Sequence, residues 1–139
     1  IRETYINDSD FQLYMKPWTH AIPDAQLNFF IDITNRSKFS LSPRGYGAQS
    51  FRFYEILQLN SIPVIVYDKK WFPFEDEIDY ESFSVLIHAD EICNLKNILN
   101  NISDKQQKDM LKRGKEIYNK YFTLNGMCKQ ILKVLQAKC

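Results

Sequence analysis

The sequence has no excess of charge of either sign. Its 18 lysines and arginines nearly balance its 17 aspartates and glutamates, so the formal net charge is only +1. A domain that binds nucleic acid or an anionic membrane through its overall field carries a clear surplus of cations, so we expect neither partner. No apolar run approaches the roughly 18 residues that a transmembrane helix needs, and we expect no membrane segment in this chain.

Cysteine and histidine are also scarce. The three cysteines, Cys93, Cys128 and Cys139, are odd in number and lack the spacing of metal ligands. We therefore expect free or buried thiols rather than a disulfide framework. The two histidines, His20 and His88, are too far apart in the sequence to indicate a metal site. The sequence thus predicts no bound metal and no resident cofactor.

Strand-like and helix-like patterns alternate along the chain. Predicted strands cover residues 10–15, 38–42, 61–68 and 82–88, and predicted helices begin at 24 and after 123 and cover 49–60, 91–102 and 104–121. Short continuous apolar strands that alternate with helices are typical of a parallel sheet covered on both faces. We therefore predict an α/β fold, with one domain over residues 1–139 and a helical C-terminal tail.

Glycine is rare, yet two of the four glycines, Gly45 and Gly47, fall in the segment SPRGYGAQ between a predicted strand and a predicted helix. Ligands of parallel sheets bind at such junctions. The helix start offers unpaired N–H groups to an anion, and the guanidinium of Arg44 can contact a phosphate with two N–H groups. These parts suit a nucleotide diphosphate. A purely structural turn is the alternative, because Gly-x-Gly alone is a weak signal.

Arg52 and Glu55 lie three residues apart and share one face of the helix that follows this loop. An ion pair that fixes the helix is one interpretation. In the other, Glu55 accepts hydrogen bonds from ribose hydroxyls, because an ionised carboxylate only accepts, and Arg52 contacts phosphate or holds Glu55 in place. The residues alone do not decide between the two.

Further along the chain, residues 37–87 resemble the core of the exostosin family, which is family 47 of the glycosyltransferases. The family pattern runs S-x-F-C-L-x-P-x-G, S-x-R-x-x-E-A-(I/L), G-x-I-P-V-I, a Pro-Phe loop and (D/W)-x-x-F-S-V. The matching residues are Ser37, Phe39, Leu41, Pro43, Gly45, Ser50, Arg52, Glu55, Ile62, Pro63, Val64, Ile65, Pro73, Phe74, Phe83, Ser84 and Val85.

The resemblance implies a two-domain glycosyltransferase of the GT-B type, of which this chain is the second, Rossmann-like, donor-binding domain. It implies inverting transfer of a sugar from a nucleotide-sugar donor, a UDP-sugar in most members, to a glycan hydroxyl, with no metal required. An N-terminal acceptor-binding domain would be the partner and would supply the general base. In keeping with such a fragment, the sequence begins at Ile1 rather than Met.

Carried over by position, the resemblance makes Arg44, Ser50, Arg52 and Glu55 donor-binding residues. Arg44 and the backbone from Gly45 through Tyr46 and Gly47 to Ser50 would hold the diphosphate, and Glu55 the ribose. Arg44 and Arg52 would be catalytic by stabilising the leaving diphosphate.

Four other features are weaker candidates. Asp68, at the end of a predicted strand, is placed to contact the sugar or the base, and Trp71 and Phe74 could stack on either or belong to the core. The Asp8-Ser9-Asp10 segment mimics a metal-binding Asp-x-Asp but precedes a weak strand, so we expect a solvated turn. Glu75-Asp76-Glu77 is expected to be an exposed acidic loop.

Two function classes and two compartments remain open at this point. The rival to an enzyme is a non-catalytic module that binds a nucleotide or a glycan and supports a partner glycosyltransferase. Arg44, Arg52 and Glu55 favour the enzyme, because such a module has no need of them. The chain by itself fits the cytoplasm, whereas a fragment of an anchored enzyme would belong in the Golgi lumen.

Overall fold

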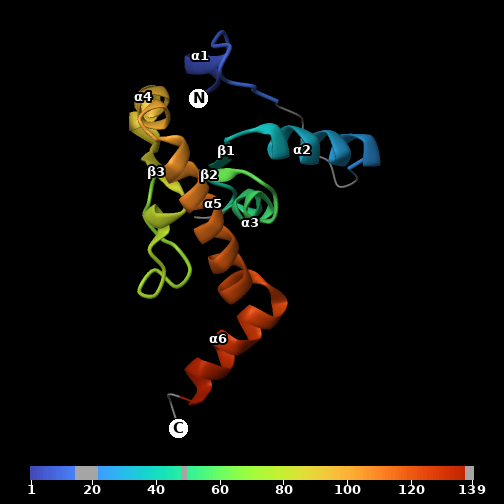
Figure 1. Cartoon of the computed structure of the whole chain (residues 1–139), viewed down its shortest axis with the longest axis vertical. Helices are drawn as coiled ribbons and strands as arrows, with labels where there is room; N and C mark the ends of the chain where they lie inside the picture. Colours follow the sequence, from blue (N-terminus) through green and yellow to red (C-terminus); the bar gives the residue numbers. More distant parts are fainter. Residues whose placement is uncertain (15–21, 48–49, 137–139) are drawn as a thin grey trace.

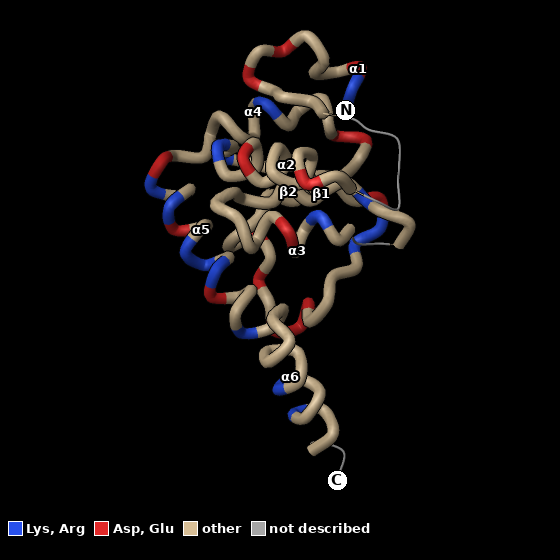
Figure 2. The backbone as a smooth tube through the Cα atoms, turned by 90° about the vertical axis from the view of Figure 1, so that its right-hand side faces the viewer, with Lys and Arg blue, Asp and Glu red and all other residues tan. Residues whose placement is uncertain are grey.

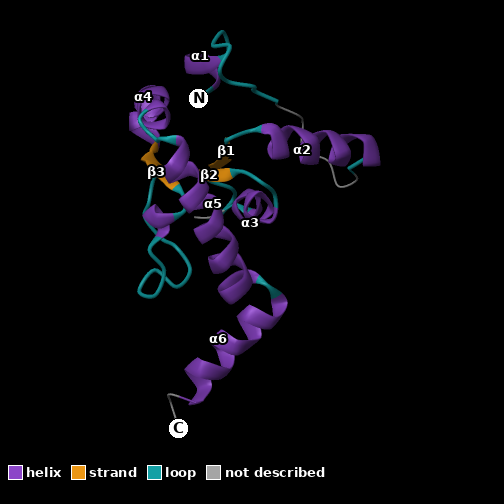
Figure 3. Cartoon of the chain, in the orientation of Figure 1, coloured by secondary structure: helices purple, strands orange, loops and turns teal. Residues whose placement is uncertain are grey.

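Three parallel strands, in the order β1-β2-β3, lie at the centre of the chain (Figures 1 and 3). The structure is a computed structural model and describes residues 1–14, 22–47 and 50–136. The strands are β1 (Phe39–Pro43), β2 (Ile62–Tyr67) and β3 (Val85–His88). The α-helices are α1 (Arg2–Tyr5), α2 (Asp24–Arg36), α3 (Phe51–Gln58), α4 (Leu95–Asn100), α5 (Asp104–Ile117) and α6 (Leu124–Gln136). The described residues also form two 3₁₀ turns, η1 (Tyr80–Ser82) and η2 (Ala89–Asn94), and one π-helical turn, η3 (Tyr118–Phe122).

The central strand β2 is buried on both faces. It pairs with β1 from Phe39↔Ile62 onward and with β3 from Val64↔Val85 onward. Because successive side chains of a strand point to opposite faces, Ile65 packs into one apolar cluster and Val64 into another. The predicted α/β fold with a parallel sheet and helices on both faces is confirmed, and its arrangement is Rossmann-like.

The first apolar cluster lies between the sheet, α3 and α5. Phe53 of α3 and Phe83 before β3 are almost fully buried there, at 1% and 0% exposure. Gly114 lets α5 approach α3, because a Cβ at this position would lie only 3.3 Å from a methyl carbon of Leu57. The outer face of α5 is charged, with cations and carboxylates interspersed along it (Figure 2). This pattern is expected of a helix that covers a core on one side only.

The second cluster, on the other face, is covered by α4 and the N-terminal segment. The Tyr5 hydroxyl donates to the Ile92 carbonyl at 2.6 Å, and the Tyr5 and Phe11 rings stack at 4.1 Å. The predicted strand over 10–15 is wrong for residues 10–14, and Met15 lies outside the described residues. The alternation there does bury apolar side chains, since Phe11 and Leu13 pack on this cluster. The backbone pairs with no strand, however, and so forms an irregular covering segment.

The helix predicted over residues 91–102 is shorter than expected. The chain first forms η2, whose start is capped by His88: the His88 Nδ1 accepts from the Asp90 amide at 3.3 Å. The α-helix α4 begins only at Leu95, which is fully buried.

Helix α6 projects away from the sheet at the C-terminal end of the described chain (Figure 1). It is joined to the body at two points: a Cβ on Gly126 would lie 2.6 Å from the Lys120 carbonyl oxygen, so α6 approaches η3 closely there, and Lys133 pairs with Glu77 at 2.9 Å. Within residues 1–14, 22–47 and 50–136, every helix is too short or too polar to cross a lipid bilayer.

Candidate functional site

The candidate site lies at the edge of the sheet where all three strands end. Parallel pairing brings the carboxyl ends of β1 and β2 together, because Pro43 is opposite Val66. The residues that follow, Arg44 and Asp68, therefore meet at this edge. The same edge leads through residues 44–50 into the start of α3, the position where ligands of open parallel sheets bind.

Arg44 and Asp68 form an ion pair. The Arg44 Nη1 donates to Asp68 Oδ2, and both side chains are a little under half exposed. Burial would raise the pKa of the Asp68 carboxyl, but the hydrogen bonds from Arg44 and from the Lys69 amide outweigh burial and hold the pKa below its ordinary value. Arg44 and Asp68, both predicted to contact the donor, therefore lie side by side. The Asp68 carboxylate fixes the direction of the Arg44 guanidinium.

Ser50 caps the start of α3. Its Oγ accepts from the Arg52 amide at 3.2 Å, which satisfies one of the N–H groups that a helix start leaves unpaired. The helix predicted over residues 49–60 is shorter at both ends, because Ser50 is an extended cap residue and α3 ends at Gln58; Gln49 itself lies outside the described residues. The cap places the loop residues directly before the positive end of the helix dipole.

Arg52 pairs with Glu55 on the first turn of α3, with 3.1 Å between Nη1 and Oε2. Its guanidinium also lies over the Phe30 ring of α2, 3.9 Å from the ring centroid. The Arg–Glu pair was predictable from its spacing. Phe30 was not, because it lies 22 residues earlier on another helix, and local spacing relates only residues of one helix.

The glycine loop is open to solvent. Tyr46 is fully exposed, and a Cβ on Gly47 would meet no atom within 4 Å. None of the described glycines has a positive φ, so the conformation of Gly47 is one that other residues can adopt. The space beside Gly47 is therefore available to a bound group.

Several of the weaker candidates make contacts within the fold. Asp8-Ser9-Asp10 lies in a turn whose Ser9 and Asp10 are exposed, as predicted, and Asp8 and Asp10 both bind Lys96, at 2.7 and 2.8 Å. Glu77 pairs with Lys133 of α6. Phe74 packs against the Tyr121 ring at 5.5 Å, whereas Trp71 is 55% exposed.

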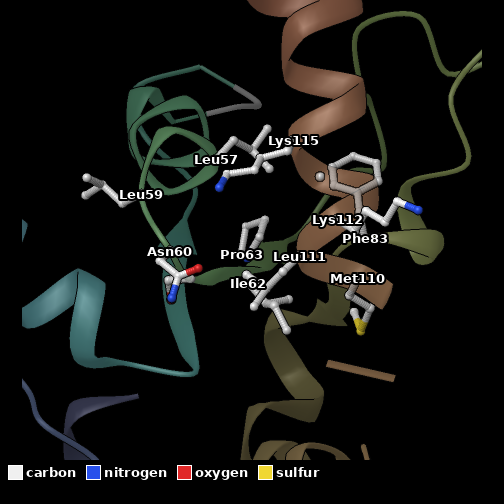
Figure 4. Close-up of a pocket in the computed structure, with 12 residues that line it drawn as sticks. Leu57, Leu59, Asn60, Ile62, Pro63, Phe83, Met110, Leu111, Lys112 and Lys115 are labelled. Atoms are coloured by element: carbon white, nitrogen blue, oxygen red, sulfur yellow. The ribbon is translucent and has the colours of Figure 1, made fainter. Parts of the chain in front are cut away.

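A cavity of about 260 Å³ lies at the opposite end of the sheet (Figure 4). Leu57, Pro63, Phe83 and Lys112 are among the residues that line it, so it lies between α3, α5 and the start of β2. We place the functional site at the strand carboxyl ends nevertheless, because the cavity has an apolar lining and lacks a cluster of chemically reactive side chains.

At the carboxyl edge the side chains can bind an anion and a diol. Arg44, Arg52 and the start of α3 supply cations and N–H donors, and Glu55 supplies an acceptor-only carboxylate. Among the described residues, no three His, Cys, Asp or Glu side chains are grouped so that they could hold a metal ion.

Residues 2–102 match the model of the Exostosin GT47 domain. A protein of Arabidopsis thaliana named "Probable glycosyltransferase" is 34% identical over 101 residues, which is 73% of this chain and 19% of the relative. The "Exostosin-1 homolog" of Caenorhabditis elegans is 24% identical over 131 residues, 93% of this chain and 34% of the relative. A "Probable arabinosyltransferase" of Arabidopsis thaliana is 31% identical over 107 residues, 73% of this chain and 24% of the relative.

The chain spans about a fifth to a third of the length of these relatives. The family model, in contrast, covers most of this chain, including all three strands, α3 and the loop between residues 44 and 50. On this match, and with the resemblance of residues 37–87 and the parallel sheet in agreement with it, the chain belongs to the exostosin family of glycosyltransferase domains.

Proposed function

We propose that this chain is the donor-binding half of a two-domain glycosyltransferase. The complete enzyme would transfer a sugar, with inversion, from a UDP-sugar to a hydroxyl of a glycan. The observation that carries the proposal is the place of two arginines at the carboxyl edge of the sheet: Arg44 follows β1 and pairs with Asp68 after β2, and Arg52 lies in the first turn of the capped helix α3. An N-terminal domain would hold the acceptor, in keeping with the small share of the relatives that this chain spans.

In the proposed complex, the diphosphate lies over the loop of residues 44–50. Arg44 and the backbone N–H groups from Gly45 through Tyr46 and Gly47 to Ser50 bind its oxygens, and Arg52 adds a second cation. Glu55 accepts from the ribose hydroxyls. Asp68 orients Arg44 through the observed ion pair and lies next to the donor.

The proposed reaction breaks the bond between the anomeric carbon and the diphosphate oxygen as the acceptor hydroxyl attacks from the opposite face. Negative charge builds up on the leaving UDP. Arg44 and Arg52 stabilise that charge, and preorganised cations of this kind supply a large share of catalysis in many enzymes. A general base in the other domain takes the acceptor proton. The donor is a substrate, and we propose no metal or resident cofactor.

Thermal unfolding with UDP, GDP and their sugars tests the donor site. A ligand at 100 times its dissociation constant stabilises the folded state by about 2.7 kcal/mol, which is easily measured. We expect UDP to raise the unfolding temperature and Glu55→Ala to reduce that effect. The matched control is Glu116→Ala, which breaks a second Arg–Glu pair of the same spacing (Arg113–Glu116, 3.2 Å) on α5. Absence of a shift with every nucleotide would refute the proposal.

A non-catalytic module is the second candidate, and one observation favours it. Both arginines already have a carboxylate partner within the chain, Asp68 for Arg44 and Glu55 for Arg52, as expected where ion pairs serve only the fold. Binding of UDP without sugar transfer by the full-length protein would support the module over the enzyme.

A further inference from the structure

Helix α2 is fixed to α3 and to the turn after it by two specific contacts. The Asn60 amide, just after α3, donates to Asn35 Oδ1 at 3.0 Å. At the start of α3, Arg52 lies over the Phe30 ring. Much of the rest of α2 is exposed, including Leu27 at 46% and Phe29 at 37%. Phe30 is thus one of few α2 side chains engaged with the body of the domain.

The Arg52 guanidinium therefore has two neighbours of different chemistry. The Glu55 carboxylate takes up one terminal nitrogen, Nη1. The Phe30 ring centroid lies 3.9 Å from the guanidinium carbon, and the ring attracts the cation without accepting any of its five N–H donors. With the side chain of Arg52 41% exposed, N–H groups that Glu55 does not use remain available to an anion.

A guanidinium held only by Glu55 could rotate about that contact, because a single ion pair at a half-exposed site restrains it weakly. Stacking on an aromatic ring fixes the plane of the group as well. Both restraints are needed if Arg52 is to present its N–H groups to a phosphate while the second oxygen of Glu55 stays available for a ribose hydroxyl.

We infer that Phe30 is a positioning residue for the donor site: its ring holds the Arg52 guanidinium in the orientation from which Arg52 meets the diphosphate. The inference rests on the proposed donor site. Phe30 itself need not touch the nucleotide, and its effect passes through Arg52.

The test measures binding of UDP and of uridine to the complete chain by calorimetry, in wild type, Phe30→Leu, Phe30→Tyr and Phe29→Leu. We expect Phe30→Leu to weaken UDP about two- to fivefold, the factor that an exposed cation–π contact supplies, and to leave uridine unchanged. Phe30→Tyr restores the aromatic face and should bind UDP as the wild type does. Phe29→Leu is the matched control, because Phe29 packs on Tyr14 and not on Arg52.

A double-mutant cycle isolates the coupling. In an Arg52→Met background, Phe30→Leu should cause no further loss of UDP affinity, because the group that it positions is gone. A readout independent of variants is nuclear magnetic resonance: the ring current should shift the Arg52 side-chain N–H signals upfield of those of Arg113.

Three results would overturn the inference alone: equal losses in Phe29→Leu and Phe30→Leu, additive losses in the cycle, or unshifted Arg52 signals, each in a protein that binds UDP. A wild type that binds no UDP would overturn the inference together with the proposed function. The two failures are therefore distinguishable.

Discussion

At the scale of single residues, Gly47 is a position where a requirement of the fold can be told apart from a requirement of a ligand. A side chain there would meet no atom within 4 Å, and φ is not positive. Neither crowding nor backbone conformation therefore requires glycine at this position. If glycine is required, the reason is a group that approaches the loop from outside, as a diphosphate would.

We predict that Gly47→Ala leaves the fold intact and weakens UDP binding. Stability should be unchanged or raised by up to about 1 kcal/mol, since alanine restricts the unfolded chain. Thermal unfolding without nucleotide and calorimetry with UDP measure the two effects. A loss of stability would show that the fold needs this glycine, and unchanged affinity would show that the donor does not approach it.

At the scale of elements, one lysine ties the N-terminal segment to α4. Lys96 Nζ lies within 2.8 Å of both Asp8 oxygens and of Asp10 Oδ2. The hydrogen bond from Lys96, followed by that from the Asp10 amide, lowers the pKa of the Asp8 carboxyl. The hydrogen bonds that Lys96 donates to Asp10 and to Asp8, in that order of size, raise the pKa of Lys96 above its ordinary value.

We predict that Asp8→Asn lowers the unfolding temperature at pH 7 and that its difference from wild type disappears in acid. A lowered carboxyl pKa contributes stability above the ordinary value of 3.8 and loses it as the pH falls through the lowered pKa. Melting curves from pH 7 to pH 2 measure the difference. Asp32→Asn, which breaks the exposed Asp32–Arg36 pair within α2, is the control and should have a small effect at pH 7. A difference that persists at pH 2 would contradict the electrostatic explanation.

Local pattern predicted the elements well and the contacts between them poorly. Strand β2 was recognisable because its run of β-favouring residues is continuous, and α3 because its apolar residues follow without a breaker. The pair Arg44–Asp68 depends on the register of β1 against β2, and Phe30–Arg52 on how α2 lies against α3. Neither relation is encoded in local spacing, so these two contacts emerged only from the structure, whereas the Arg52–Glu55 pair followed from its spacing.

At the scale of the whole molecule, β2 joins two cores. Phe83, with no exposed surface, belongs to the cluster under α3 and α5, and Leu95, also with none, belongs to the cluster under α4. Alternate residues of β2 pack into each. A substitution that weakens packing on one face of the sheet should therefore destabilise the other face as well, because both faces depend on the same strand.

We predict that Phe83→Ala and Leu95→Ala each destabilise the whole domain, by about 3–5 and 2–5 kcal/mol respectively. Urea unfolding followed by circular dichroism should show one cooperative transition for each variant, shifted to lower urea. Two separate transitions, with one core lost before the other, would contradict this coupling. Leu27→Ala, on the exposed face of α2, is the control and should shift the transition little.

The two ends of β2 have different surroundings. The carboxyl end leads to Asp68 and the other charged side chains of the candidate site, whereas the amino end borders the cavity lined by Leu57, Pro63 and Phe83. Six residues of strand separate them, or about 20 Å at the usual rise. A small molecule that fills the cavity would therefore not overlap a nucleotide at the proposed donor site. Compound screens based on nucleotide displacement would miss such molecules, whereas melting screens would detect ligands at either end without telling them apart. Inhibitor discovery on this domain needs both assays on the same library.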